Sequence, residues 1–134
     1  MSHIVFVATL SASALFANPQ TPDPRENVDT AITTAIHLLE ERDYERLVEW
    51  FVHPDDAQII STRRDLNRAL RPLGPGDKAS HMLTILRSIK DGRPQYSNDG
   101  TIASYEIPWR SLARGASIRT IQFRKAGKFW YLIF

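Results

Sequence analysis

The chain contains no cysteine, which excludes disulfides, thiol catalysis, thiolate metal sites and lipidation of a cysteine at an export signal. Its four histidines (His3, His37, His53 and His81) are far apart, without the His-x-x-x-His or carboxylate spacing that metal sites use. The sequence also has no glycine-rich phosphate loop and no nucleophile motif around a serine. It therefore predicts no catalytic residue, no metal and no cofactor.

Long hydrophobic runs are missing as well. The uncharged, mostly apolar stretch 4–17 is shorter than the roughly 20 residues of a transmembrane helix. Bulky residues at its start are followed by small ones, an order typical of a secretory signal peptide. Residues 1–3 lack the usual Lys or Arg, so a first strand or helix packed on the domain is the alternative. We predict a signal peptide at 1–17, an extended lead-in at 18–23 and export to the periplasm or medium; without cleavage the protein is cytoplasmic.

The length of the chain fits one domain, and its charged residues are unevenly distributed along the sequence. A chain of 134 residues with 43% hydrophobic content fits a single globular domain. Up to Asp65 there are five basic and eleven acidic residues, a net charge of −6, whereas from Leu66 onward twelve basic and four acidic residues give +8. Either the two halves attract each other or one face of the fold is basic.

Helices are expected in the first two thirds of the domain. Asp23 as N-cap, Pro24 at the first position and apolar residues at helical spacing predict a helix over 24–41. Asp43 is the cap of a second helix that Pro54 ends. Two more helices follow, one opened by a capping box of Thr62 and Asp65 and continuing to about Leu70, the other carrying Met82, Ile85, Leu86 and Ile89.

The periodicity then changes to that of strands. After a turn at Asn98-Asp99-Gly100, alternating apolar residues from Ala103 to Trp109 predict a strand over 101–109 with one buried face. Residues 117–125 and 128–134 are two further strands joined by a tight turn at Gly127. The order indicates an α+β domain, residues 24–134, with N-terminal helices packed on an antiparallel sheet.

The last strand is apolar on both faces, unlike an ordinary half-exposed strand, which is polar on one. Both faces therefore need cover, by helices on one side and by a second subunit or a ligand cavity on the other. One face carries Phe129, Tyr131 and Ile133, and the other carries the residues that we predict at a homodimer interface: Trp130, Leu132 and Phe134.

Two segments resemble the NTF2-like superfamily. Residues 41–51, a short helix after an aspartate turn, are similar to its second helix, and residues 121–132 are similar to its closing hairpin. The resemblance covers roughly residues 24–134. It implies a curved sheet wrapped around helices in an NTF2-like or cystatin-like cone, with a pocket at the open end and dimers through the sheet. Members include isomerases, dehydratases, epoxide hydrolases and transport factors, so the fold does not decide the function.

Enzymes of this superfamily often place an Asp, Tyr or His inside the cone for acid–base work. None of the residues of this type aligns with a catalytic pattern, and the turn position of Asp99 and the helix-end position of His53 have ordinary structural explanations. The residues considered are Tyr44, His53, His81, Tyr96, Asp99 and Tyr105.

Aromatic and basic residues suggest binding. Aromatic side chains are able to line an apolar pocket, although they equally suit a core: the predicted pocket residues are Trp50, Tyr105, Trp109 and Tyr131. Basic residues gather in the C-terminal part at Arg110, Arg114, Arg119, Arg124, Lys125 and Lys128. We expect a non-catalytic domain that binds a small apolar or anionic ligand or a partner protein. A small-molecule isomerase or hydrolase is the alternative and an anion- or nucleic-acid-binding module the third, although export argues against nucleic acid.

Overall fold

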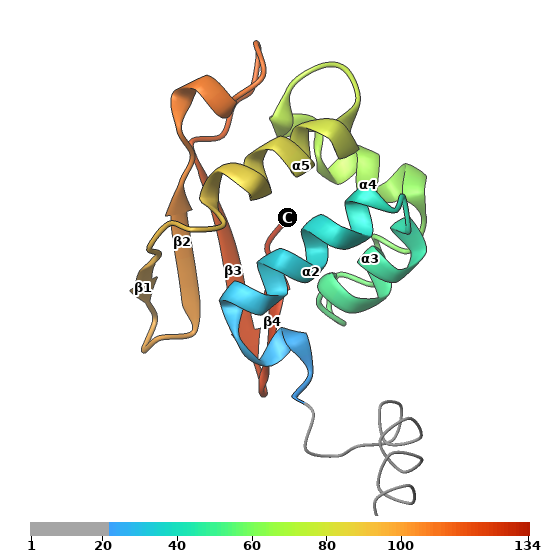
Figure 1. Cartoon of the computed structure of the whole chain (residues 1–134). Helices are drawn as coiled ribbons and strands as arrows, with labels where there is room; N and C mark the ends of the chain where they lie inside the picture. The colour runs from blue at the N-terminus through green and yellow to red at the C-terminus, as the bar shows by residue number, and fades with distance from the viewer. Residues whose placement is uncertain (1–21) are drawn as a thin grey trace, which may run out of the picture.

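The computed structural model describes residues 22–134, an α+β fold (Figure 1). The predicted signal peptide at 1–17 and most of the lead-in at 18–23 lie outside the described residues. No helix in the described part is long and apolar enough to cross a membrane. The elements, in chain order, are η1 (Pro24–Glu26), α2 (Val28–Glu40), α3 (Tyr44–Phe51), α4 (Arg63–Ala69), η2 (Arg71–Leu73), α5 (Lys78–Ile89), β1 (Gln95–Ser97), β2 (Ile102–Glu106), η3 (Trp109–Ser111), β3 (Thr120–Ala126) and β4 (Phe129–Leu132), where η denotes a 3-10 helix.

The strands form one antiparallel sheet in the order β1-β2-β3-β4, and α2 and α5 pack together on one of its faces (Figure 1). The register places Ala103 opposite Phe123, and Phe123 opposite Leu132. These side chains point to the same face and are buried in one continuous hydrophobic core with both helices. The predicted packing of helices on an antiparallel sheet is confirmed.

Aromatic side chains of the two edge strands approach each other across the helix-covered face. Tyr96 on β1 and Trp130 on β4 are separated by two intervening strands, which in a flat sheet is about 14 Å. Their ring centroids nevertheless lie 6.3 Å apart. Ala103 pairs with Tyr96, and its small side chain leaves room for the Tyr96 ring on this face.

The predicted first helix is in fact two elements. Asn27 has an extended backbone with φ −130°, and its side-chain Oδ1 accepts a hydrogen bond from the Asp29 N–H at 2.8 Å. Asn27 therefore caps α2, and the capping box of Asp23 and Glu26 closes only the short η1. The caps predicted at Asp43 and Thr62 are confirmed. Strand β1 was not predicted, because its residues are exposed and lack an apolar alternation.

The predicted strand over 101–109 is also shorter. β2 ends at Glu106, and the Ile107 N–H makes one last bond to the Arg119 carbonyl. Pro108 has no N–H to continue the ladder. Trp109 consequently lies in η3 and is 80% exposed, so its predicted place on the buried face of the strand is wrong.

Both faces of β4 are covered by the chain itself. Trp130 and Leu132 are buried on the helix-covered face. On the opposite face, the ring of Tyr131 packs edge-on against His53, with centroids 5.1 Å apart. The guanidinium of Arg25 lies 4.1 Å from the centroid of the Phe129 ring.

Arg25 connects η1 with α3 and β4. Its Nε and Nη2 atoms donate to the two carboxylate oxygens of Asp23 at 3.0 and 2.8 Å, and its guanidinium also lies 5.1 Å from the Trp50 ring centroid. The hydrogen bond from Arg25 lowers the pKa of Asp23 below its usual value. A carboxyl with a lower pKa in the folded state contributes stability above its unfolded pKa and loses it as the pH falls through the folded pKa.

We predict that Asp23→Asn lowers the free energy of unfolding by about 1–2 kcal/mol at neutral pH, because the variant loses a charge-assisted pair with Arg25. The difference from wild type should shrink as the pH falls below the ordinary pKa of an aspartate and vanish once Asp23 is protonated in the folded state as well. Urea unfolding followed by tryptophan fluorescence over a pH series measures both. Asp99→Asn, in an exposed turn, is the matched control. Equal pH dependence of wild type and Asp23→Asn would contradict the prediction.

Candidate functional site

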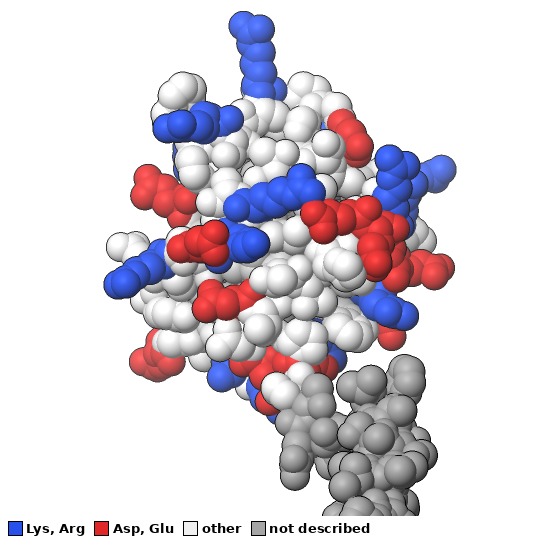
Figure 2. Space-filling model, viewed as in Figure 1, with Lys and Arg blue, Asp and Glu red and all other residues white. Residues whose placement is uncertain are grey.

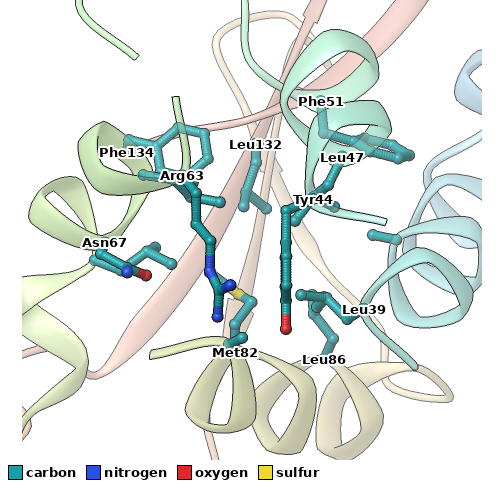
Figure 3. A pocket seen from close by; sticks show the side chains of 14 residues that line it. Leu39, Tyr44, Leu47, Phe51, Arg63, Asn67, Met82, Leu86, Leu132 and Phe134 are labelled. Atoms are coloured by element: carbon teal, nitrogen blue, oxygen red, sulfur yellow. The ribbon is translucent and has the colours of Figure 1, made fainter. Parts of the chain in front are cut away.

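An apolar pocket lies where the four α-helices meet β4, and Figure 3 shows the side chains that surround it. Most of them are aliphatic or aromatic, so a bound molecule would meet an apolar wall. Fourteen residues line the pocket: Ala35, Leu39, Tyr44, Leu47, Phe51, Arg63, Leu66, Asn67, Leu70, Ala79, Met82, Leu86, Leu132 and Phe134.

The closed pocket is small. Its cavity volume is about 20 Å³, roughly the space that one water molecule occupies. A water there would find few polar partners, because nearly all of the lining is apolar, and such cavities tend to stay dry. The unfilled space is therefore suited to apolar atoms.

Two side chains meet at the mouth of the pocket. The guanidinium of Arg63 lies 4.5 Å from the ring centroid of Tyr44, a cation–π contact. Each is the first residue of its helix, Tyr44 after the cap Asp43 and Arg63 after the cap Thr62. The caps therefore determine where both residues lie. Arg63 is the one charged residue among the fourteen that line the pocket.

A second, more open groove of about 130 Å³ adjoins the pocket. Leu70, Met82 and Phe134 line both spaces, so these side chains form the partition between them. Phe134 follows the end of β4 and is 36% exposed, whereas Leu70 and Met82 are buried. Phe134 is thus the member of the partition with the least packing to hold it.

None of the four predicted pocket residues lines the interhelical pocket. Trp50 is half-buried beneath Arg25, and Tyr131 is buried beneath His53. Tyr105 lies in the core, where its ring packs edge-on against Phe123, and Trp109 is on the surface. The interhelical pocket was missed because the signals at its lining residues, helical spacing and end-of-strand apolarity, are those of any core.

The residues predicted at a dimer interface differ in exposure. Trp130 and Leu132 are buried within one chain, and Phe134 presents part of its ring to solvent. Homodimerisation through the sheet stays a prediction. Of these three residues, Phe134 is the one whose exposed surface is able to contact a second subunit.

The acid–base candidates are spread over separate elements. Tyr44 is at the pocket mouth, Asp99 is in a left-handed turn with φ +57°, and the Nε2 of His81 lies 2.7 Å from the Pro75 carbonyl oxygen. Tyr96 is exposed on β1, and His53 lies beside β4. Within residues 22–134 no Asp, Glu or His is buried, and no three such residues form a group able to hold a metal ion.

No family model, curated protein or solved structure matches the chain. The resemblance to the NTF2-like superfamily therefore stays an expectation that rests on residues 41–51 and 121–132.

Tyr105 is a core residue with an unpaired hydroxyl. It is 2% exposed, and its hydroxyl oxygen has no hydrogen-bond partner among the described residues. Burial raises its pKa to about 12. A general acid or base needs a partner within hydrogen-bond reach, and the surroundings of this hydroxyl do not supply one.

We predict that Tyr105→Phe leaves the free energy of unfolding unchanged or raises it by up to about 1 kcal/mol, because it removes a buried group that has no partner. Tyr105→Ala, which removes the ring as well, should cost about 3–5 kcal/mol. Urea unfolding of both variants separates the hydroxyl from the ring. A loss of more than 1 kcal/mol for Tyr105→Phe would indicate a partner for the hydroxyl.

Proposed function

We propose that this protein is a non-catalytic binding domain that takes a small apolar molecule with one negative charge into the interhelical pocket. The observation that carries the proposal is an apolar cavity whose mouth holds a single charged side chain, Arg63. Apolar walls with few polar groups are the usual composition of a ligand site. An arginine at the rim favours a carboxylate, because its N–H donors match the two carboxylate oxygens.

Binding requires the pocket to open. A ligand must displace Arg63 from the ring of Tyr44 and turn the side chain of Phe134, after which the pocket and the adjoining groove become one space. The last backbone bond beyond β4 runs from the Ile133 N–H to the Gln122 carbonyl, so turning Phe134 costs little ordered structure. Together the two spaces, about 20 and 130 Å³ and lined mostly by apolar residues, have the volume of a cavity that accommodates a benzene-sized molecule. The ligand class is accordingly a carboxylate with one aliphatic chain or small aromatic ring that begins in the pocket and extends along the open groove.

The proposal includes export and an NTF2-like fold. Support for export is the signal-peptide pattern in residues 1–17, and support for the fold family is the resemblance of residues 41–51 and 121–132.

We predict that octanoate binds the full chain and that Arg63→Gln weakens this binding about tenfold, the effect of losing one charge-assisted hydrogen bond. Octanol, which has no charge, should bind wild type and Arg63→Gln equally. Isothermal titration calorimetry measures both. Arg64→Gln is the matched control, because it removes the same charge from the neighbouring exposed position. Equal octanoate affinity of wild type and Arg63→Gln would exclude Arg63 as the carboxylate-binding residue.

Two variants test the location of the site. Phe134→Ala removes the partition and should strengthen octanoate binding, whereas Ala79→Leu fills the pocket from α5 and should abolish it. Thermal unfolding confirms that both variants are folded. Unchanged binding by a folded Ala79→Leu variant would place the site elsewhere.

A further inference from the structure

A wide, open depression of about 720 Å³ lies at the end of β2, beside η3 and the loop that follows it. We call it the Trp109 depression, because the Trp109 side chain in its lining is 80% exposed. The residues that line it are Glu106, Ile107, Pro108, Trp109, Leu112, Ala113, Gly115, Ala116 and Arg119, and none of them lines the interhelical pocket.

The loop after η3, which lines the depression, packs its backbone against the segment that contains Pro72 and Gly74. The Ser117 N–H donates to the Pro72 carbonyl at 2.8 Å. A Cβ atom on Gly74 would lie 3.2 Å from the Arg114 carbonyl oxygen, closer than nearly all real contacts, so the two backbones are in direct contact. Gly115 has φ +87°, a conformation that glycine adopts without strain. These contacts therefore hold the loop after η3 against the segment that contains Pro72 and Gly74.

Basic residues belong to the segment that lines the depression: Arg119 is in the lining, and Arg110 and Arg114 are sequence neighbours of lining residues. Arg110, Arg114 and Arg119 are exposed, as is Arg71 in η2. Within residues 22–134, none of these four has a carboxylate oxygen within 4.0 Å. Figure 2 shows Lys and Arg side chains projecting at this upper end, while Asp and Glu gather where α2 ends and α3 begins. Arg87 and Glu40 form the one ion pair in this range between residues distant in sequence.

We propose that the Trp109 depression docks an acidic segment of a partner protein. An apolar side chain of the segment packs on Trp109, and neighbouring carboxylates meet Arg110, Arg114 and Arg119. Exposed tryptophan and arginine are the residue types that contribute most to binding at protein interfaces. Unpaired arginines around a concave surface are complementary in charge to such a segment.

Other occupants fit these features less well. A membrane surface is flat, whereas this site is concave. Nucleic acid is bound through several stacking aromatic residues along a basic groove, and here there is one aromatic residue with Glu106 in the lining. A second copy would have to present its acidic α2–α3 region, a head-to-tail contact that continues into rings or filaments.

The test uses the full chain and a short synthetic peptide of glutamates around one central leucine. Peptide binding should change the fluorescence of the exposed Trp109 and should weaken as the salt concentration rises. Trp109→Ala should reduce the affinity at least tenfold, as for an interface hot spot, and Arg119→Gln about threefold. The controls are Ile59→Ala, another exposed apolar residue at 72%, and Arg64→Gln, which removes the same charge far from the site. The affinity of each variant is measured by calorimetry.

Trp109→Ala should keep the melting temperature of wild type because the side chain is exposed, so a lost affinity reports the contact itself.

Equal binding of a glutamine version of the peptide, or unchanged affinity of Trp109→Ala, would overturn the proposal. Tighter binding of an oligothymidylate would indicate nucleic acid, and tighter binding of phosphatidylserine vesicles a membrane. Self-association in sedimentation that Trp109→Ala abolishes would indicate a second copy. Each of these three results would also overturn the proposal of an acidic partner segment. Octanoate binding to the interhelical pocket is measured in parallel, so the two proposals fail independently.

Discussion

The burial of the helix-covered face of the sheet against α2 and α5 is the constraint on which the other features depend. Ala103 and Phe123 lie fully buried in this contact, and removing such area from water is the main favourable contribution to folding. Because α2 and α5 occupy this face, α3 contacts the sheet at β4, and α4 packs against α3. The apolar pocket is located there, at the junction of the four helices with β4.

Both proposed sites lie at the ends of elements, where side chains are positioned without being fully packed. Tyr44 and Arg63 each begin a capped helix, and Trp109 begins η3 directly after Pro108. A rigid scaffold that presents residues at such points is the usual arrangement for binding sites. The two sites differ in chemistry, since the pocket is apolar with one cation and the Trp109 depression is open and rimmed by arginines.

Much of the fold was predictable because the signals are local. The caps at Asp43 and Thr62 and the hairpin turn at Gly127 depend on residues within a few positions of one another. The break at Asn27 was missed because a capping box at Asp23 gives the same local pattern whether the helix continues or not. The end of β2 was signalled by Pro108, but the alternation up to Trp109 outweighed it.

The sequence by itself determined the α+β class, the order of helices before strands and the separation of acidic and basic halves, because periodicity, capping and composition are properties of neighbouring residues. Only the tertiary structure decided that Arg63 and Tyr44 meet over an apolar cavity, that Phe134 separates two spaces, and that Trp109 faces solvent while Trp130 does not. These facts depend on contacts between residues distant in the chain, and such contacts arise from how whole elements pack. Local pattern therefore predicted where apolar residues are, and packing determined which of them enclose a cavity.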